Sequence, residues 1–423
     1  MKRHLYLTCN LGNYDAFFCK IKEDFDIEFD KYTEKGDLIY ESREAVEKLS
    51  DMEREKVKAL SELPELQNFI DNIIEFRLDV FRDVFREDSE DTLNDDCNYE
   101  LISNFISKLK NLRGFTLYGV PCIEFSCLAG STELTSLQLP KMMLTEVPKW
   151  IGKLKKLKQL VLEDNQITEL PEWLFELESL ETFVVEGCLL KALPESIVKL
   201  KNLKTLYLDI SDDMPLPKSL AELKKLENLC IFNRKLTQLP DIICELTSLT
   251  KLKLVGEELP NGLEQLESLA ELDLVNNNLT KLPKSITQLK NLKSLNLGDN
   301  KLTCLPDGFE QLEKLEELDL ASNNLTELPK SITQLKNLKI LDLGYNKLAY
   351  SPDGFEQLKS LEELKLTNIY LTELPKSITQ LKNLKSLNLR DNKLACLPDG
   401  FEQLESLEKL DLANNYLTEL PKS

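Results

Sequence analysis

Residues 315–335 read LEELDLASNNLTELPKSITQL, and this stretch decides the fold. The L-D-L of residues 318–320 alternates as a short strand does, so both leucines face inward and Asp319 faces outward. Asn323 follows where the chain turns, and its amide is expected to satisfy backbone groups of its own coil and the next. Pro329 cannot donate to a strand ladder, so it begins a return limb.

The return limb closes the coil with apolar residues. Ile332 and Leu335 have the i, i+3 spacing of a helical turn. One such coil buries nothing alone. When coils stack, each inward leucine contributes about 1.5–3 kcal/mol, and the strands pair into one parallel sheet.

The same coil recurs along the chain. Thirteen of the 17 prolines keep one phase of one period. The period is 23 residues except for one coil of 20, as the first leucine of each coil shows: Leu134, Leu157, Leu180, Leu203, Leu226, Leu249, Leu269, Leu292, Leu315, Leu338, Leu361, Leu384 and Leu407. From Lys284 onward a 46-residue double repeat is visible, in which basic KSITQLKNLK coils alternate with acidic DGFEQL coils.

These motifs resemble the leucine-rich repeat family, and the L-P before a helical turn is similar to its cytoplasmic Ras-suppressor type, seen also in Scribble-like scaffolds and many bacterial repeat proteins. The resemblance covers about residues 112–423. It implies an α/β solenoid, a leucine-rich repeat horseshoe with a parallel concave sheet, here with an α-rich N-terminal cap or domain. Such proteins mostly bind other proteins through variable surface positions.

The turn asparagine is not present in every coil. Met142, Cys188, Ser211, Arg234 and Ile369 replace it. The 20-residue coil that begins at Leu249 lacks that turn, which predicts a local change of curvature near residues 255–260.

Two domains are predicted: residues 1–110 as an α-rich cap or small domain, and 111–423 as an array of about 13–14 repeats, the last incomplete. In the first, residues 5–8 and 25–29 have the alternation of short strands. Helices are expected over 41–63, from Pro64 through an apolar run, and over 99–112. The helix from Pro64 carries Phe69, Ile70, Ile73, Ile74, Val80, Phe81, Val84 and Phe85. These helices are expected to seal Leu117 and Leu128 of the first coil.

Composition limits the partners. A net charge of −20 argues against nucleic acid and anionic membranes, which need clustered Lys and Arg. An acidic surface favours a protein partner with a basic surface, although plain solubility is its commonest role. No apolar stretch fits a transmembrane helix. Ten scattered cysteines without C-x-x-C, and no visible secretory signal, predict a cytoplasmic protein or one delivered into a host cytosol.

No catalytic centre, metal site or cofactor is expected, and the chain is predicted not to be an enzyme. A nucleophile–base pair could come only from His4 with Cys9 or Cys19, because His4 is the sole histidine. No G-x-x-x-x-G-K-[ST] sequence is present, which excludes the GTPase of Roco proteins.

The inner sheet face is where binding should occur. In the later coils the outward strand residue is polar, as at Asp273 and Asn296. In the first half it is mostly apolar and lies beside acidic or aromatic residues, which either marks a binding patch or reflects the strand preference of such residues. The predicted partner-binding residues are Val161, Glu163, Val184, Glu186, Tyr207, Asp209, Cys230 and Phe232.

The sequence thus favours a binding scaffold that holds a protein partner on the concave face, mainly in the first half of the array. The alternative is a bacterial effector or regulatory subunit whose N-terminal segment acts on a signalling pathway. A further expectation concerns Leu410, Leu412, Leu417 and Leu420, whose coil stops before its closing residues. An open strand edge there invites end-to-end association, unless the natural polypeptide is longer.

Overall fold

We describe a computed structural model of the chain. The structure describes the backbone alone for residues 3–10 and 73–81. Backbone and side chains are described for 106–107, 109, 111–118, 126–188, 190–209, 216–232, 240–256, 259–348 and 354–418. The chain divides into two compact units, Met1–Leu190 and Lys191–Ser423, and each is described by itself. Among the described residues, no helix has the length and apolarity to cross a membrane.

The first unit is a parallel sheet whose strands follow one another in chain order. Its strands are β1 (Arg3–Asn10), β2 (Ile73–Phe81), β3 (Gly114–Tyr118), β4 (Ser136–Gln138), β5 (Gln159–Val161) and β6 (Thr182–Val185). The return limbs contain short 3₁₀ turns: η3 (Ser126–Gly130), η4 (Lys149–Lys153) and η5 (Glu172–Glu176). Equivalent leucines are register partners, as with Leu137 and Leu160.

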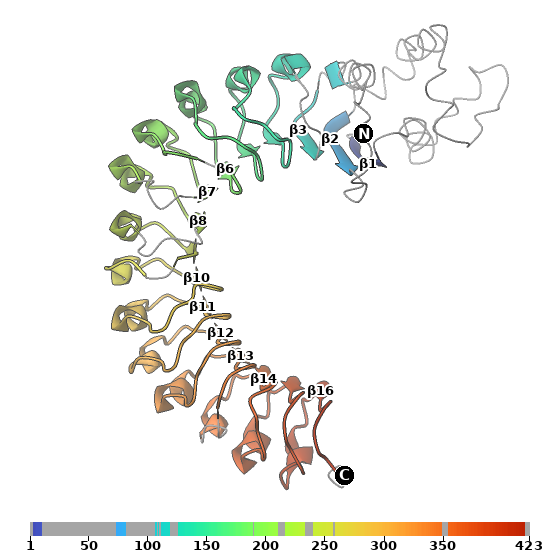
Figure 1. Cartoon of the computed structure of the whole chain (residues 1–423), viewed down its shortest axis with the longest axis vertical. Helices are drawn as coiled ribbons and strands as arrows, with labels where there is room; N and C mark the ends of the chain where they lie inside the picture. The colour runs from blue at the N-terminus through green and yellow to red at the C-terminus, as the bar shows by residue number, and fades with distance from the viewer. Residues whose placement is uncertain are drawn as a thin grey trace, which may run out of the picture. The chain divides into compact units, whose positions relative to one another are not determined.

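The second unit repeats this plan in a curved array (Figure 1), with strands on the inner side and 3₁₀ turns on the outer side. Its parallel strands are β7 (Thr205–Asp209), β8 (Asn228–Phe232), β9 (Lys251–Leu254), β10 (Glu271–Asp273), β11 (Ser294–Asn296), β12 (Glu317–Asp319), β13 (Ile340–Asp342), β14 (Glu363–Lys365), β15 (Ser386–Asn388) and β16 (Lys409–Asp411). Its turns are η6 (Glu195–Lys199), η7 (Lys218–Glu222), η8 (Asp241–Glu245), η9 (Leu263–Gln265), η10 (Lys284–Gln288), η11 (Phe309–Gln311), η12 (Lys330–Gln334), η13 (Phe355–Gln357), η14 (Lys376–Gln380) and η15 (Phe401–Gln403).

The predicted coil is confirmed at 315–335 in its strand, its proline and its return limb. Leu318 and Leu320 are fully buried. Pro329 stands before η12 with extended backbone, and the N–H of Leu335 donates to the carbonyl of Ile332 at 3.2 Å. Stacked leucines fill the interior of the array, so the core is a column rather than a single centre.

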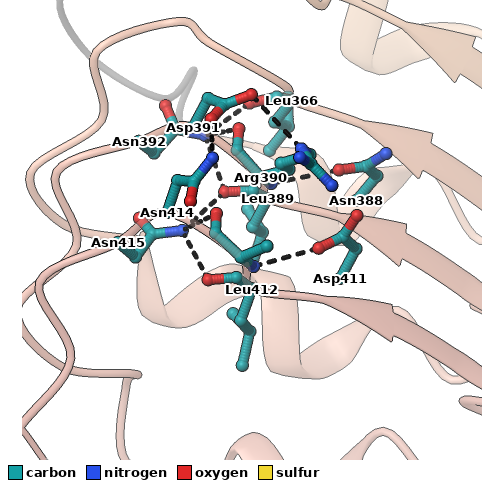
Figure 2. Close-up of polar contacts among 11 residues, drawn as sticks. Leu366, Asn388, Leu389, Arg390, Asp391, Asn392, Asp411, Leu412, Asn414 and Asn415 are labelled. Atoms are coloured by element: carbon teal, nitrogen blue, oxygen red, sulfur yellow. Dashed lines mark hydrogen bonds and ion pairs between the residues drawn. The ribbon is translucent and has the colours of Figure 1, made fainter.

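The turn asparagines fasten each coil to the coil before it. In Figure 2 the Nδ2 of Asn392 donates to the carbonyls of Leu366, Leu389 and Arg390, and Asn415 repeats the pattern one coil later. Leu366 lies 26 residues before Asn392. The prediction that the amide hydrogen-bonds to the next coil is therefore wrong, because the amide bonds to the coil before it.

Neighbouring coils of the double repeat enter their return limbs differently. The KSITQ coils begin a five-residue turn after proline, whereas the DGFEQ coils begin a three-residue turn after glycine. Gly308 has φ 102°, and a Cβ there would meet Gln311 Nε2 at 3.1 Å. The glycine is required because its conformation is one that L side chains rarely adopt.

The helix expected from Pro64 is wrong over 73–81, where the chain forms β2. Phe76, Leu78 and Val80 alternate with charged residues, which is strand periodicity. The apolar residues of this stretch also fall at helical spacing, and the parallel partner β3 decides between the two patterns. Phe76 and Leu78 are register partners of Phe115 and Leu117.

Other N-terminal expectations have mixed outcomes. Residues 5–8 lie in β1, as predicted. The expected strand at 25–29 and helix at 41–63 lie outside the described residues. Ile106, Leu109 and Leu112 are buried and linked by successive N–H···O bonds, the pattern of a return limb, so the repeat begins before residue 112.

Leu117 and Leu128 are fully buried, but whether the N-terminal helices seal them stays a prediction. The domain boundary at 110 also stays a prediction.

The 20-residue coil keeps the sheet in register. Leu252 of β9 pairs with Leu229 on one side and Leu272 on the other. The side chain of Asn277 accepts from the N–H of Gly256 and donates to the carbonyl of Leu254 at 2.7 Å, so the shortened turn is still fastened to the next coil. The predicted change of curvature near 255–260 stays a prediction.

Candidate functional site

The outward strand residue has a structural role in most later coils. Asp319 Oδ1 accepts the N–H of Ala321 at 2.9 Å, which bends the backbone away from the strand direction. Such a bond to the residue two positions on recurs at Asp273, Asn296, Asp342, Asn388 and Asp411. Each of these strands ends at its Asp or Asn. The polar column is therefore explained by turn formation.

Several strands whose outward residue cannot make this bond are longer than the three-residue strands of the later coils. In the second unit β7 and β8 pair over five residues, and Asp209 and Phe232 are the last register partners. The sheet face is consequently wider here than at the three-residue strands of later coils. This widened face holds four of the residues that the sequence singled out.

In the first unit the predicted site residues lie on β5, on β6 and directly after these strands. Val161 and Val184 are register partners, but only 9% and 8% of their surfaces are exposed. Glu163 and Glu186 are half-buried. A short β-branched side chain between strands about 4.8 Å away on either side has little accessible surface. The carboxylates are the part of this face that a partner can reach.

In the second unit the predicted residues pair in register across β7 and β8. Tyr207 lies beside Cys230, of which 4% is exposed, while Tyr207, Asp209 and Phe232 are each half-buried. The ammonium of Lys253 lies 5.7 Å from the centroid of the Phe232 ring. Two aromatic rings, a carboxylate and a cation thus share one sheet face.

The electrostatics of the later coils differ. Burial raises the pKa of Asp319, and the nearby Asp342 and Asp299 carboxylates add to the rise, although the hydrogen bond from Ala321 opposes it. Lys365 lies 3.5 Å from Asp342 and partly compensates the charge. This column is an acidic strip with one cation, unlike the aromatic face of β7 and β8.

No reactive centre is visible in the part of the chain that the structure describes. It contains no group of three or more His, Cys, Asp or Glu that could hold a metal ion. Burial raises the pKa of the Cys244 thiol to about 12, which makes it unreactive. His4 and Cys9 lie on β1, whose side chains are not described, and Cys19 lies outside the described residues.

Sequence reasoning missed a set of exposed aromatic residues in the turns. Tyr345, Tyr370 and Tyr416 are exposed by 53%, 53% and 68%. From Leu269 onward the other coils have Asn, Asp or Ser at the position of Tyr345, and Asn or Lys at the position of Tyr370 and Tyr416. An alignment of the coils with one another would therefore have found the three tyrosines.

The last described coil differs from its predecessors in burial. Leu410 is 41% exposed, whereas the equivalent Leu387 is 1% exposed. Leu412 and Leu417 are half-buried, and Leu420 lies outside the described residues. Self-association through this end stays a prediction, which light scattering at high concentration tests.

Models of one repeat family match most of the array. A model described as "Leucine-rich repeat region" matches residues 151–256 and 284–374. Two others, "Leucine rich repeat" and "Leucine Rich Repeat", match 360–417 and 268–289. No curated protein matches the chain.

Solved structures include several similar chains. A leucine-rich repeat protein of Leptospira interrogans is 38% identical, with a TM-score of 0.67 over 75% of this chain and 82% of that one. The ectodomain of the plant receptor kinase GASSHO1/SCHENGEN3 from Arabidopsis thaliana, in complex with CASPARIAN STRIP INTEGRITY FACTOR 2, is 24% identical, with a TM-score of 0.53 over 85% and 46%. The glycosylated Toll–Spatzle complex of Drosophila is 24% identical, with a TM-score of 0.62; the match covers 83% of this chain and 49% of that one. The last two show likeness of fold alone.

Proposed function

Because the chain belongs to the leucine-rich repeat family, we propose that it is a scaffold that binds a protein partner on the inner face of its sheet. Solenoids offer an extended concave surface suited to this role. Two proteins of the same fold were solved with their named partners, the plant receptor kinase and Toll. Such repeat domains are in general binding rather than catalytic. The cytoplasmic Ras-suppressor subtype stays a prediction.

The observation that supports the proposal best is the face of β7 and β8. Tyr207 and Phe232 are half-buried on the strands, and Asp209 lies beside Phe232 in register. Binding energy concentrates on aromatic residues at the centre of an interface. The carboxylates of Glu163 and Glu186 on the first unit's sheet face favour a partner with a basic surface.

The experiment uses the full chain. A tagged copy captures partners from its native cells, and the captured protein is then purified and titrated by calorimetry. The double variant Tyr207→Ala/Phe232→Ala should weaken binding by about 2 kcal/mol or more, roughly 30-fold. A matched control is Lys251→Ala/Glu271→Ala, which removes an exposed ion pair of 2.7 Å beside this face. Unchanged affinity in a folded Tyr207→Ala/Phe232→Ala variant would overturn the proposal.

We further propose that the protein works in a reducing compartment. The described cysteines are free thiols: Cys127, Cys188, Cys230, Cys244, Cys304 and Cys396. Several of them are buried in an apolar array that holds together by stacking. Thermal melting with and without reductant tests this proposal. A large loss of stability on reduction would contradict it.

A further inference from the structure

Two tyrosines in the turns of the second unit have a backbone conformation that is unfavourable for them. Tyr345 has φ 56° and Tyr370 has φ 64°, both in the left-handed region. Bulky residues rarely adopt it, whereas Asn and Asp do so more easily. Strain of this kind at an exposed residue points toward function.

The other coils are an internal control for these positions. The position of Tyr345 is occupied by Asp299, φ 52°, and Asp391, φ 59°, in the coils of the same type. The position of Tyr370 is occupied by Asn278, φ 57°. The same backbone therefore forms with residues that suit it better. The turn does not require tyrosine.

The turn of Tyr345 is held by its backbone rather than by its ring. The N–H of Tyr345 donates to the carbonyl of Thr367 at 2.7 Å, a bond that Ser322 and Asp299 make in their own coils. Within the described ranges, the phenol of Tyr345 has no hydrogen bond or ring contact. With Tyr416, which lies in the next coil of the same KSITQ type as that of Tyr370, three exposed rings occupy the turns that follow β13, β14 and β16.

Lysines alternate with these rings. Lys347, Lys393 and their equivalent Lys301 occupy the position of Tyr370 and Tyr416 in the intervening coils. Lys393 Nζ lies 5.5 Å from the centroid of the Tyr370 ring. None of the three lysines has an ion pair with a described residue.

Other lysines of the same coils are neutralised. Lys339 pairs with Glu316 at 2.6 Å and Lys385 with Glu362 at 2.7 Å. The nearby Asp391 carboxylate is itself engaged, at 3.4 Å from Arg390 Nε and 2.5 Å from Asn414 Nδ2. In a chain of net charge −20, the edge formed by Tyr345, Lys347, Tyr370, Lys393 and Tyr416 is thus a cluster of unneutralised cations between aromatic rings.

We propose that this tyrosine–lysine edge is a second docking surface and that its occupant is an extended acidic peptide segment of another protein. Carboxylates of the segment pair with Lys347 and Lys393, and its apolar side chains pack on the tyrosine rings. From Lys347 to Tyr416 are three coil steps, about 15 Å at the strand spacing, which about five extended residues span. A nucleic acid fits less well, because its backbone carries a charge at every nucleotide against the acidic field of the chain.

The test is a selection from random dodecamer peptides displayed on phage. The wild-type full chain is the bait, and the variant Tyr345→Asp/Tyr370→Asn/Tyr416→Asn is used for depletion. This variant carries residues that the chain's own coils hold at these positions, so it is expected to melt at the same temperature or higher. Enriched peptides are expected to be acidic with apolar or aromatic residues.

The best peptide is then synthesised and titrated by fluorescence anisotropy. Lys347→Gln/Lys393→Gln should weaken its binding at least tenfold, and the loss should shrink as salt rises. Lys301→Gln, which lies away from the tyrosines, should leave binding unchanged. Neutral or basic selected peptides, no enrichment over the depletion variant, or a lower melting temperature of that variant would overturn the proposal. So would binding of a single-stranded oligonucleotide or a neutral glycan in place of acidic peptides.

Discussion

The amide of Asn323 donates to the carbonyl oxygen of Leu297, 26 residues earlier, across 2.9 Å. Its Oδ1 accepts the N–H of Leu302 in the same earlier coil at 3.0 Å. Asn323 also donates to Leu320 of its own coil. One buried side chain therefore closes its turn and holds two coils together.

Replacing this residue should destabilise the array. We expect Asn323→Ala to lower the free energy of unfolding by about 2–5 kcal/mol, because several buried backbone groups lose their partner. Urea denaturation followed by circular dichroism measures it. The neighbouring Asn324→Ala is the control, with an expected change of about 0.5 kcal/mol or less. Equal losses for both variants would show that the buried bonds are not what matters.

Asp319 gives a pH-dependent prediction. Its pKa is raised in the folded state, mainly by burial. At a pH between the ordinary pKa of an aspartate and the raised pKa of Asp319, the folded protein binds more protons than the unfolded protein. The free energy of unfolding therefore falls as pH rises through this window. Asp319→Asn keeps the acceptor for Ala321 and removes the charge. Its urea midpoint should exceed that of wild type at pH 7, and the gain should vanish below the ordinary pKa of an aspartate.

The control for this prediction is Asp273→Asn. It changes the equivalent residue of another coil, but it removes a carboxylate ion-paired with Lys253 at 3.0 Å. No gain is expected from it. A gain for Asp319→Asn that persists undiminished at low pH would contradict the role of its charge.

Gly308 should be intolerant of alanine. Its φ of 102° is unfavourable for any residue with a Cβ, and the new atom would crowd the side chain of Gln311. A loss of about 1–2 kcal/mol is expected from thermal melting. Gly130→Ala, where a Cβ meets nothing within 4 Å, should be close to neutral.

The N-terminal strands should be structural. β2 pairs with β3 over five residues, so deletion of residues 1–97 opens the edge of β3 beside Phe115 and Leu117. An open edge next to a packed core favours aggregation. The deletion variant is expected to aggregate or to melt at a markedly lower temperature. A soluble variant with unchanged melting would instead indicate an independent N-terminal domain.

The coil architecture could be predicted from sequence because its information is periodic. Leu318, Asn323, Pro329 and Ile332 recur at fixed positions, and each position has one physical role. β2 could not be predicted in this way, because its apolar residues satisfy two periods at once. The pairing of β2 with β3 decides that this stretch is a strand, and the paired residues Phe76 and Phe115 are 39 positions apart in the sequence.

The candidate site was only partly predictable. Alternation gives the direction of a side chain but not what surrounds it, so Val161 and Cys230 were read as accessible although little of either is exposed. Tyr345 and Tyr370 were overlooked because the pattern treats their positions as variable. What singles them out is a bulky side chain at a positive φ that Asp or Asn adopts in the equivalent turns.

The alternating charges have a consequence for how this protein can change length in evolution. Nearly identical 46-residue segments in a gene favour unequal recombination, which adds or removes one segment. Loss of a full segment would place Lys293 beside Glu362 instead of Glu316, so opposite charges would still meet. Each KSITQ coil would also still lie next to DGFEQ coils. Loss of half a segment would place Lys293 beside Lys339. The array is therefore expected to lengthen and shorten two coils at a time.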